Sequence, residues 1–177
     1  FSREGRGKLT FPTKFDMVQP LLRLDHREKV IFRMSVNPEE IIRRVELGTS
    51  PLDARIRALN AMADAGYPVG MLIAPVILVQ DWKRLYGALI DRLSDSLSPA
   101  VRQKGFIEII LMTYSFVHRA INAEAFPKSE SLYDPGLMTG RGRGRYRYRD
   151  GARAEAEAFF RQELAKRLPK MDIVYVS

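Results

Sequence analysis

The chain alternates between short, dense apolar runs and longer segments in which apolar residues return at helical spacing. The dense runs are rich in β-branched and aromatic residues and are bounded by turn residues, a pattern typical of β-strands. Residues 69–78 are apolar almost throughout, which indicates a strand covered on both faces, as in a parallel sheet. The predicted strands are residues 8–13, 30–36, 69–77, 106–113 and 171–176.

The segments between the strands carry helix signals. Asn37 and Asp81 each precede a helical pattern and are predicted to cap it, and Gly48 is a predicted helix stop. Ser98 followed by proline indicates a break or a short turn, and residues 126–140 are predicted to form a loop. The predicted helices cover residues 15–24, 38–47, 51–65, 82–93, 115–123 and 152–168.

The alternation of strands and helices predicts the fold class. Strands that alternate with helices indicate an α/β protein with a mostly parallel, curved sheet. The first strand, at residues 8–13, has no earlier strand to protect its edge. That is natural for the second half of a (β/α) barrel, so we predict a partial barrel in which residues 1–177 form a single region.

Composition places the chain among globular proteins, with 46% hydrophobic and 28% charged residues. The apolar runs are too short or too interrupted to span a bilayer, and the N-terminal residues lack a secretory signal pattern, so we expect a cytoplasmic protein without membrane contact. The 29 Lys and Arg against 21 Asp and Glu give a net charge of +8. A charge of this sign favours a phosphate-rich partner, although a basic surface that only aids solubility remains an alternative.

The chain has no cysteine and only two histidines, His26 and His118, which are far apart in the sequence. This excludes disulfides, cysteine nucleophiles and thiolate metal sites within the chain. We therefore predict no metal site here, and no residue pattern identifies a catalytic group.

Polar residues stand where the predicted strands end. Lys14 follows the first strand, Ser35 ends the second, and Ala74 lies late in the third. In a parallel barrel, functional groups collect at the carboxyl ends of the strands. A lysine and a serine at that edge could hold a carboxylate, and exposed backbone at Ala74 could approach a flat ring. The alternative is a surface lysine and a strand-end serine without a ligand.

Residues 137–150 form the most unusual segment, because arginines alternate with glycines and tyrosines between Arg141 and Arg149. If the segment is extended, all five arginines lie on one face and Tyr146 and Tyr148 on the other. Guanidinium groups near aromatic rings suit phosphates and stacked bases, so a hairpin or loop that contacts nucleic acid is predicted. A solvated Arg/Gly loop is the alternative.

Several strings, in their order and spacing, resemble the carboxyl-terminal half of the spore photoproduct lyase family, which consists of radical S-adenosylmethionine (SAM) enzymes of DNA repair. The resemblance is strong over residues 8–78 and fainter through the arginine segment. The strings are Thr13-Lys14-Phe15, the residues from Phe32 to Asn37, those from Gly48 to Ile56, those from Ala65 to Gly70, and Ile73-Ala74-Pro75.

The resemblance implies half of a radical SAM TIM-like barrel and the cofactors SAM and an iron–sulfur (4Fe-4S) cluster. In the family, reductive cleavage of SAM gives a 5′-deoxyadenosyl radical that starts the reversal of a thymine–thymine lesion. By position, Lys14 and Ser35 match residues expected to hold the SAM carboxylate, and Ala74 matches a backbone contact to adenine. The partner implied is DNA containing a thymine photolesion, with a hairpin over residues 140–148 entering it. The expected DNA-contacting residues are Arg141, Arg143, Arg145, Tyr146 and Tyr148.

The chain departs from the family pattern in two ways. The three-cysteine motif that binds the cluster is absent, as is the family's hydrogen-donating cysteine, so this chain alone is not expected to bind the cluster or to be active. The expected Arg-Tyr-Gly of the hairpin is Gly140-Arg141-Gly142 here, so a lesion-contacting tyrosine is not matched at that place. A cysteine-free or truncated relative that binds nucleic acid without catalysis is the main alternative, and a related radical enzyme with another substrate is a third.

Overall fold

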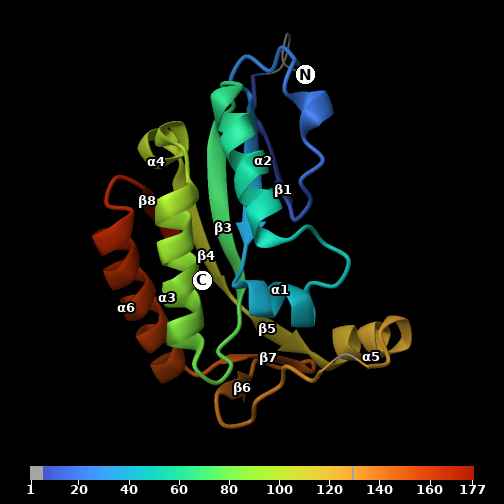
Figure 1. Ribbon diagram of the computed structural model, residues 1–177. Helices are drawn as coiled ribbons and strands as arrows, with labels where there is room; N and C mark the ends of the chain where they lie inside the picture. The colour runs from blue at the N-terminus through green and yellow to red at the C-terminus, as the bar shows by residue number, and fades with distance from the viewer. Residues whose placement is uncertain (1–5, 129) are drawn as a thin grey trace.

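The computed structural model describes residues 6–128 and 130–177 and is organised around a five-stranded sheet with helices on one face (Figure 1). The strand order is β1-β2-β3-β4-β8, and every neighbouring pair is parallel. The sheet does not close into a barrel within these residues, so the predicted partial barrel with a mostly parallel sheet is confirmed. The strands are β1 (Leu9–Thr13), β2 (Val30–Val36), β3 (Val69–Val76), β4 (Phe106–Leu111) and β8 (Asp172–Val176).

Strand β2, which lies between β1 and β3, shows why the sheet has two different faces. Its side chains alternate, so Phe32, Met34 and Val36, each 0% exposed, point into the core beneath the helices. Arg33 and Ser35 point to the opposite face, which no helix of the described chain covers (Figure 1). That uncovered face at the carboxyl edge is where the polar residues lie.

The helices form one layer, in which α2 packs on β2 and β3 and α3 packs on α6. They are α1 (Glu39–Val45), α2 (Leu52–Asp64), α3 (Trp82–Ser96), α4 (Pro99–Lys104) and α6 (Asp150–Arg167), with a short 3-10 helix η1 at Gln19–Leu21.

Three expectations about the helices are corrected. The predicted helix over residues 15–24 shrinks to η1, because Pro20 occupies its middle and residues after it turn back toward β2. Asn37 does not cap α1, because its side-chain amide instead donates to Glu46 and to the Pro75 carbonyl. Asp81 precedes α3 with a φ of 59° but makes no side-chain cap.

A second, smaller sheet stands beyond the carboxyl edge of the parallel strands (Figure 1). It is antiparallel, in the order β5-β7-β6, with β5 at Thr113–Ser115, β6 at Met138–Gly140 and β7 at Arg145–Tyr148. Helix α5 (Phe116–Ala125) continues directly from β5. The predicted strand over 106–113 therefore ends at Leu111, and the predicted loop over 126–140 ends in a strand that begins at Met138. Across the described parts of the chain, no helix combines the length and the apolar character needed to cross a membrane.

Gly70 on β3 lies against the ring of its neighbour in register, Phe106 on β4. A Cβ at Gly70 would stand 2.4 Å from that ring, so Gly70→Ala is expected to destabilise the fold by about 1–3 kcal/mol through overpacking. Gly87→Ala in α3 is the control, since apart from its chain neighbours and the backbone of its own helix no atom lies within 4 Å of the new Cβ. There we expect a gain of about 0.8–1.0 kcal/mol from helix propensity. Urea unfolding curves that shift in the same direction for both variants would contradict the account.

Candidate functional site

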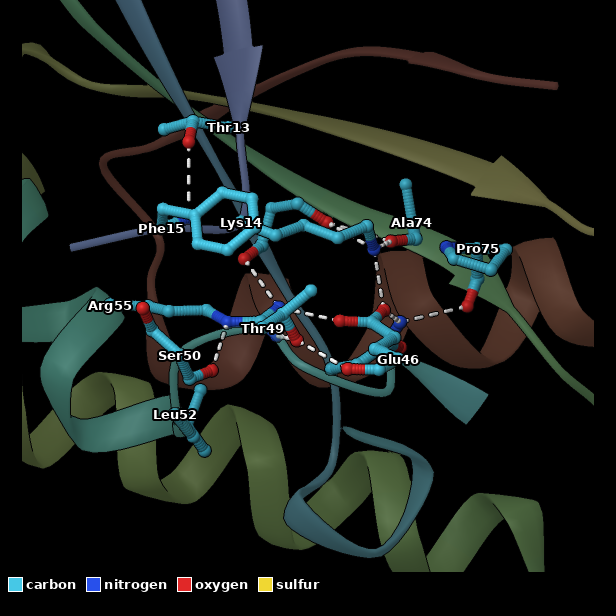
Figure 2. A network of polar contacts seen from close by, with 12 residues as sticks. Thr13, Lys14, Phe15, Glu46, Thr49, Ser50, Leu52, Arg55, Ala74 and Pro75 are labelled. Atoms are coloured by element: carbon cyan, nitrogen blue, oxygen red, sulfur yellow. Dashed lines mark hydrogen bonds and ion pairs between the residues drawn. The ribbon is translucent and has the colours of Figure 1, made fainter. Parts of the chain in front are cut away.

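Lys14 is the centre of a polar cluster at the carboxyl edge of the sheet (Figure 2). Its ammonium donates to Ser35 Oγ at 3.1 Å, to Glu46 Oε1 at 2.5 Å and to the Ala74 carbonyl at 3.0 Å. The Ser35 hydroxyl donates in turn to the same Ala74 carbonyl at 2.7 Å. The structure thus brings together Lys14, Ser35 and Ala74, the three residues expected at a cofactor site, from the ends of three neighbouring strands.

A buried ion pair stands behind this cluster. Glu46 comes at the end of α1 and has a side chain only 3% exposed, and Arg55 of α2 is 0% exposed. Their closest atoms, Glu46 Oε2 and Arg55 Nη1, are 2.7 Å apart. Arg55 also donates to the Ser50 carbonyl, the Ser35 carbonyl and the Thr49 hydroxyl, which holds the loop after α1 against β2 (Figure 2).

The cluster carries a surplus of positive charge. Lys14 and Arg55 are cations and Glu46 is the one anion of the three, so these groups sum to one positive charge. Burial lowers the pKa of Lys14, although the hydrogen bond that it donates to Glu46 opposes that shift. Burial raises the pKa of Glu46, but hydrogen bonds from Lys14 and Asn37 outweigh burial and leave it below its usual value. The site is therefore suited to an additional anion.

A cavity of about 460 Å³ opens beside Lys14 on the uncovered face of the sheet. Its walls are mainly apolar, and the polar groups Lys14 and Ser35 lie on one side. Phe15 stands among the lining residues with 47% of its surface exposed. An apolar pocket of this size with few polar groups is the usual form of a small-molecule site. The lining residues are Pro12, Thr13, Lys14, Phe15, Ser35, Leu72, Ala74, Pro75 and Ile110.

Sequence reasoning missed Glu46 and Arg55. The sequence carried a signal for each residue. Glu46 is an acid near the end of a helix, where it opposes the helix dipole. Arg55 lies three residues after Leu52 and four before Leu59, which places it on the apolar face of its helix. Each is a reason to look for a buried partner of opposite charge.

The arginine segment is a β-hairpin. Gly142, Arg143 and Gly144 have φ values of 81°, 52° and 68°, so the chain reverses between β6 and β7. The condition for five arginines on one face, a segment extended throughout, is therefore not met, because residues with left-handed backbone turn the chain into a hairpin. Arg141, Arg143 and Arg145 are exposed, and their side chains have no hydrogen bond or ion pair with any residue that the structure describes.

The two tyrosines of the hairpin differ in position. Tyr148 is 1% exposed, and its hydroxyl accepts a hydrogen bond from the Leu78 backbone N–H at 2.9 Å. Burial raises its pKa to about 12. Tyr148 is therefore a core residue and is corrected out of the expected DNA-contacting set, because a base cannot reach its ring. Tyr146 is half-buried and touches other aromatic rings of the small sheet.

No metal site appears in residues 6–128 and 130–177, because they hold no cluster of three or more His, Cys, Asp or Glu side chains. The chain has no cysteine, so its residues do not fit the ligand set of an iron–sulfur cluster. The fit to a small molecule with a carboxylate is good, since the cluster has a spare positive charge beside an apolar cavity.

The fold and the site define an α/β protein with part of a (β/α) barrel, an anion-suited pocket at the carboxyl edge and a basic hairpin beyond it. Comparison with known proteins gives the family. The sequence profile of spore photoproduct lyase matches residues 1–177, and the chain belongs to that family. It is 36% identical to the spore photoproduct lyase of Bacillus subtilis (strain 168) over 130 residues, which cover 73% of this chain and 38% of that protein.

Other relatives agree. The Geobacillus spore photoproduct lyase is 32% identical over 96% of this chain and 51% of its own length. The chain superposes with a TM-score of 0.88 and 29% identity on a mutant spore photoproduct lyase with bound AdoMet and dinucleoside spore photoproduct, over 97% of this chain and 52% of that chain. A second mutant of the enzyme superposes with a TM-score of 0.90 and 28% identity, over 99% of this chain and 53% of that chain. The chain thus spans about half the length of these relatives.

Proposed function

We propose that this chain provides the SAM-binding and DNA-contacting residues of a spore photoproduct lyase, the enzyme that reverses a thymine–thymine photolesion. When bound, SAM supplies the radical chemistry of such an enzyme. Among the residues of this chain, Lys14 and Ser35 hold the SAM carboxylate, the Ala74 backbone contacts the adenine, and the hairpin from Gly140 to Tyr148 meets the DNA.

The main support for the SAM site is the unbalanced charge of Lys14, Glu46 and Arg55. All three N–H bonds of the Lys14 ammonium point at acceptors within the chain, so an incoming carboxylate replaces one of them. The Ser35 hydroxyl now donates to the Ala74 carbonyl, and by rotation it can donate to a carboxylate oxygen instead. Glu46 keeps its contact with Lys14 and fixes where the ammonium stands. The apolar walls of the cavity suit the flat adenine ring.

The support for DNA contact is the exposed, unpartnered set Arg141, Arg143 and Arg145 at the tip of the hairpin. Three guanidinium groups held on a tight turn repel one another unless an anion lies between them. DNA phosphates are the anions that arginine forks match geometrically. A damaged base must also leave the stack to be reached by an enzyme, so the DNA that the hairpin is proposed to contact includes unpaired nucleotides.

A nucleic-acid-binding relative without catalysis is the second candidate, because the net charge of +8 and the exposed arginines of the turn suit DNA without any cofactor. One assay distinguishes the two functions. It incubates the native full-length protein with an oligonucleotide that contains the spore photoproduct. Restoration of two thymines with SAM and a reductant supports the lyase. Binding to that oligonucleotide without any repair under the same conditions supports the second candidate.

Lys14→Ala is expected to weaken SAM binding about 10- to 150-fold in the native full-length protein. The reason is that the carboxylate loses a charge-assisted hydrogen bond, worth about 1.5–3 kcal/mol. Glu46 and Arg55 remain paired with each other in this variant, so the fold should persist. Titration calorimetry measures the affinity.

Lys8→Ala is the matched control, because Lys8 is exposed at the start of β1 and does not line the cavity. Unchanged SAM affinity is expected for the control. Equal affinities for the Lys8 and Lys14 variants would remove Lys14 from the site.

A further inference from the structure

Four aromatic rings gather on the small sheet next to the arginine turn. Tyr114 of β5, Phe116 at the start of α5, Tyr133 and Tyr146 of β7 have ring centroids between 4.9 and 6.3 Å apart. Tyr114 is 7% exposed, whereas Phe116 keeps 45% of its surface exposed. Tyr133 and Tyr146 are partly buried, so one buried and two partly buried rings support the one that is exposed.

The backbone ties Phe116 to the arginine turn. The Phe116 N–H donates to the Gly144 carbonyl at 3.2 Å, and the Phe116 ring meets the Tyr146 ring edge to face at 5.3 Å and 89°. Gly144 lies between Arg143 and Arg145, so the exposed phenyl ring is held next to the backbone of the arginine turn. An exposed apolar ring that adjoins a turn with unpartnered arginines is unusual for a surface that only faces water.

The neighbouring helix face is apolar as well. None of the residues of α5 is buried, and Val117 and Ile121 are 62% and 59% exposed. A protein partner could cover such a helix face, but the adjacent charge is strongly positive, so the surface as a whole complements an anionic partner with flat apolar groups. Single-stranded or unstacked DNA has both properties, since each nucleotide joins a phosphate to a base with two π faces.

We propose that Phe116 is a base-stacking residue that receives an unstacked nucleobase of the DNA whose phosphates the arginine turn neutralises. Aromatic and aliphatic side chains that replace lost stacking partners are a general device of proteins that open a duplex. Phe116 then gives preference for DNA with an unpaired base over intact duplex, which the arginines cannot give because phosphate contacts do not depend on base stacking. This inference rests on the DNA contact proposed above.

The test uses the native full-length protein and a duplex that carries one unpaired 2-aminopurine, with a fully paired duplex as the comparison. Phe116→Ala is expected to weaken binding to the first DNA about 5- to 150-fold, the range found when a stacking aromatic is removed. It should leave the salt dependence of binding unchanged, because no phosphate contact is lost. The 2-aminopurine fluorescence change that accompanies stacking should disappear, and Phe116→Trp should restore both affinity and fluorescence change.

Phe126→Ala is the matched control, since Phe126 is a phenylalanine with a similar exposure of 47% just after α5, and none of the ring contacts of this cluster involves it. Equal affinity of the Phe116 and Phe126 variants for the unpaired duplex would overturn the inference, and so would a change in oligomeric state of Phe116→Ala without a change in DNA affinity. Rescue of affinity by Phe116→Leu as fully as by Phe116→Trp would also overturn it, because leucine packs on the cluster without a π face.

The outcomes separate this inference from the function on which it rests. If the unmodified protein binds DNA with a steep salt dependence and Phe116→Ala binds equally well, only the stacking role fails. If the unmodified protein binds neither duplex, the DNA contact fails and the stacking role falls with it.

Discussion

Glu46→Ala is expected to lower the free energy of unfolding by about 3–5 kcal/mol, the usual cost of removing one partner of a buried ion pair. Arg55 would remain 0% exposed with its positive charge uncompensated, next to Lys14. Its remaining hydrogen bonds to Ser50, Ser35 and Thr49 satisfy three of its five N–H donors and do not balance its charge. Urea unfolding of the purified variant measures the loss.

Glu40→Ala is the matched control for this prediction. Glu40 also pairs with an arginine, Arg44 at 3.1 Å, but both side chains are about 40% exposed. An exposed pair of this kind contributes only about 0–1 kcal/mol. A loss for Glu46→Ala no larger than that for Glu40→Ala would show that the buried charge is compensated by other means.

The pH dependence follows from the same pair. The folded protein holds the pKa of Glu46 below its usual value, so the carboxylate stabilises the fold above the unfolded pKa of about 4.3. As the pH falls through the folded pKa, the group becomes protonated in both states and that contribution is lost. The stability difference between the unmodified protein and Glu46→Gln is therefore expected to be largest near neutral pH and to shrink in acid.

We expect a smaller salt dependence of DNA binding when Arg141, Arg143 and Arg145 are replaced together with alanine. The slope of log affinity against log salt concentration should become less negative by about 2.7. This assumes one phosphate per arginine and about 0.9 per phosphate neutralised. Between 50 and 200 mM salt, the unmodified protein should then lose about 40-fold more affinity than the variant does. Filter binding or fluorescence anisotropy at several salt concentrations gives both slopes.

The control for the arginine variant removes the same charge elsewhere. Arg23, Arg57 and Arg102 are exposed and lie outside the hairpin, so their triple alanine variant should keep the original slope. SAM affinity should be unchanged in both variants, because the cavity is built from other residues. An identical slope in all three proteins would mean that the turn is only solvated.

The sequence predicted where the candidate site lies better than it predicted which buried polar contacts hold the site together. Lys14, Ser35 and Ala74 follow strands whose apolar runs are easily recognised, and parallel strands end at one edge, so their meeting followed from topology. The pairing of Glu46 with Arg55 did not follow, because it joins the end of one helix to the buried face of the next and depends on how the intervening loop folds. Asn37 was misassigned for a related reason, since the side-chain oxygen that a cap would use accepts instead from the hydroxyl of Tyr86, far along the chain.

The small sheet shows another limit. Strands β5 and β6 have three residues each, too few for a period-2 pattern to stand out from the surrounding loop. In the arginine segment, alternation was visible, but the reversal of the chain depends on left-handed backbone at Arg143 as well as at two glycines. The burial of Tyr148 depends on the end of β3, 70 positions earlier in the chain, which no local pattern encodes.

The hydrogen bond between the Tyr148 hydroxyl and the Leu78 N–H has an evolutionary consequence. It fixes the base of the hairpin to the parallel sheet through a residue outside the turn, so this attachment does not depend on the side chains of residues 141–144. Substitutions, insertions or deletions in the turn can then accumulate while the cavity at Lys14 stays intact. A lineage could therefore vary the sequence of the turn, including Gly140–Gly142, without losing the attachment of the hairpin to the parallel sheet.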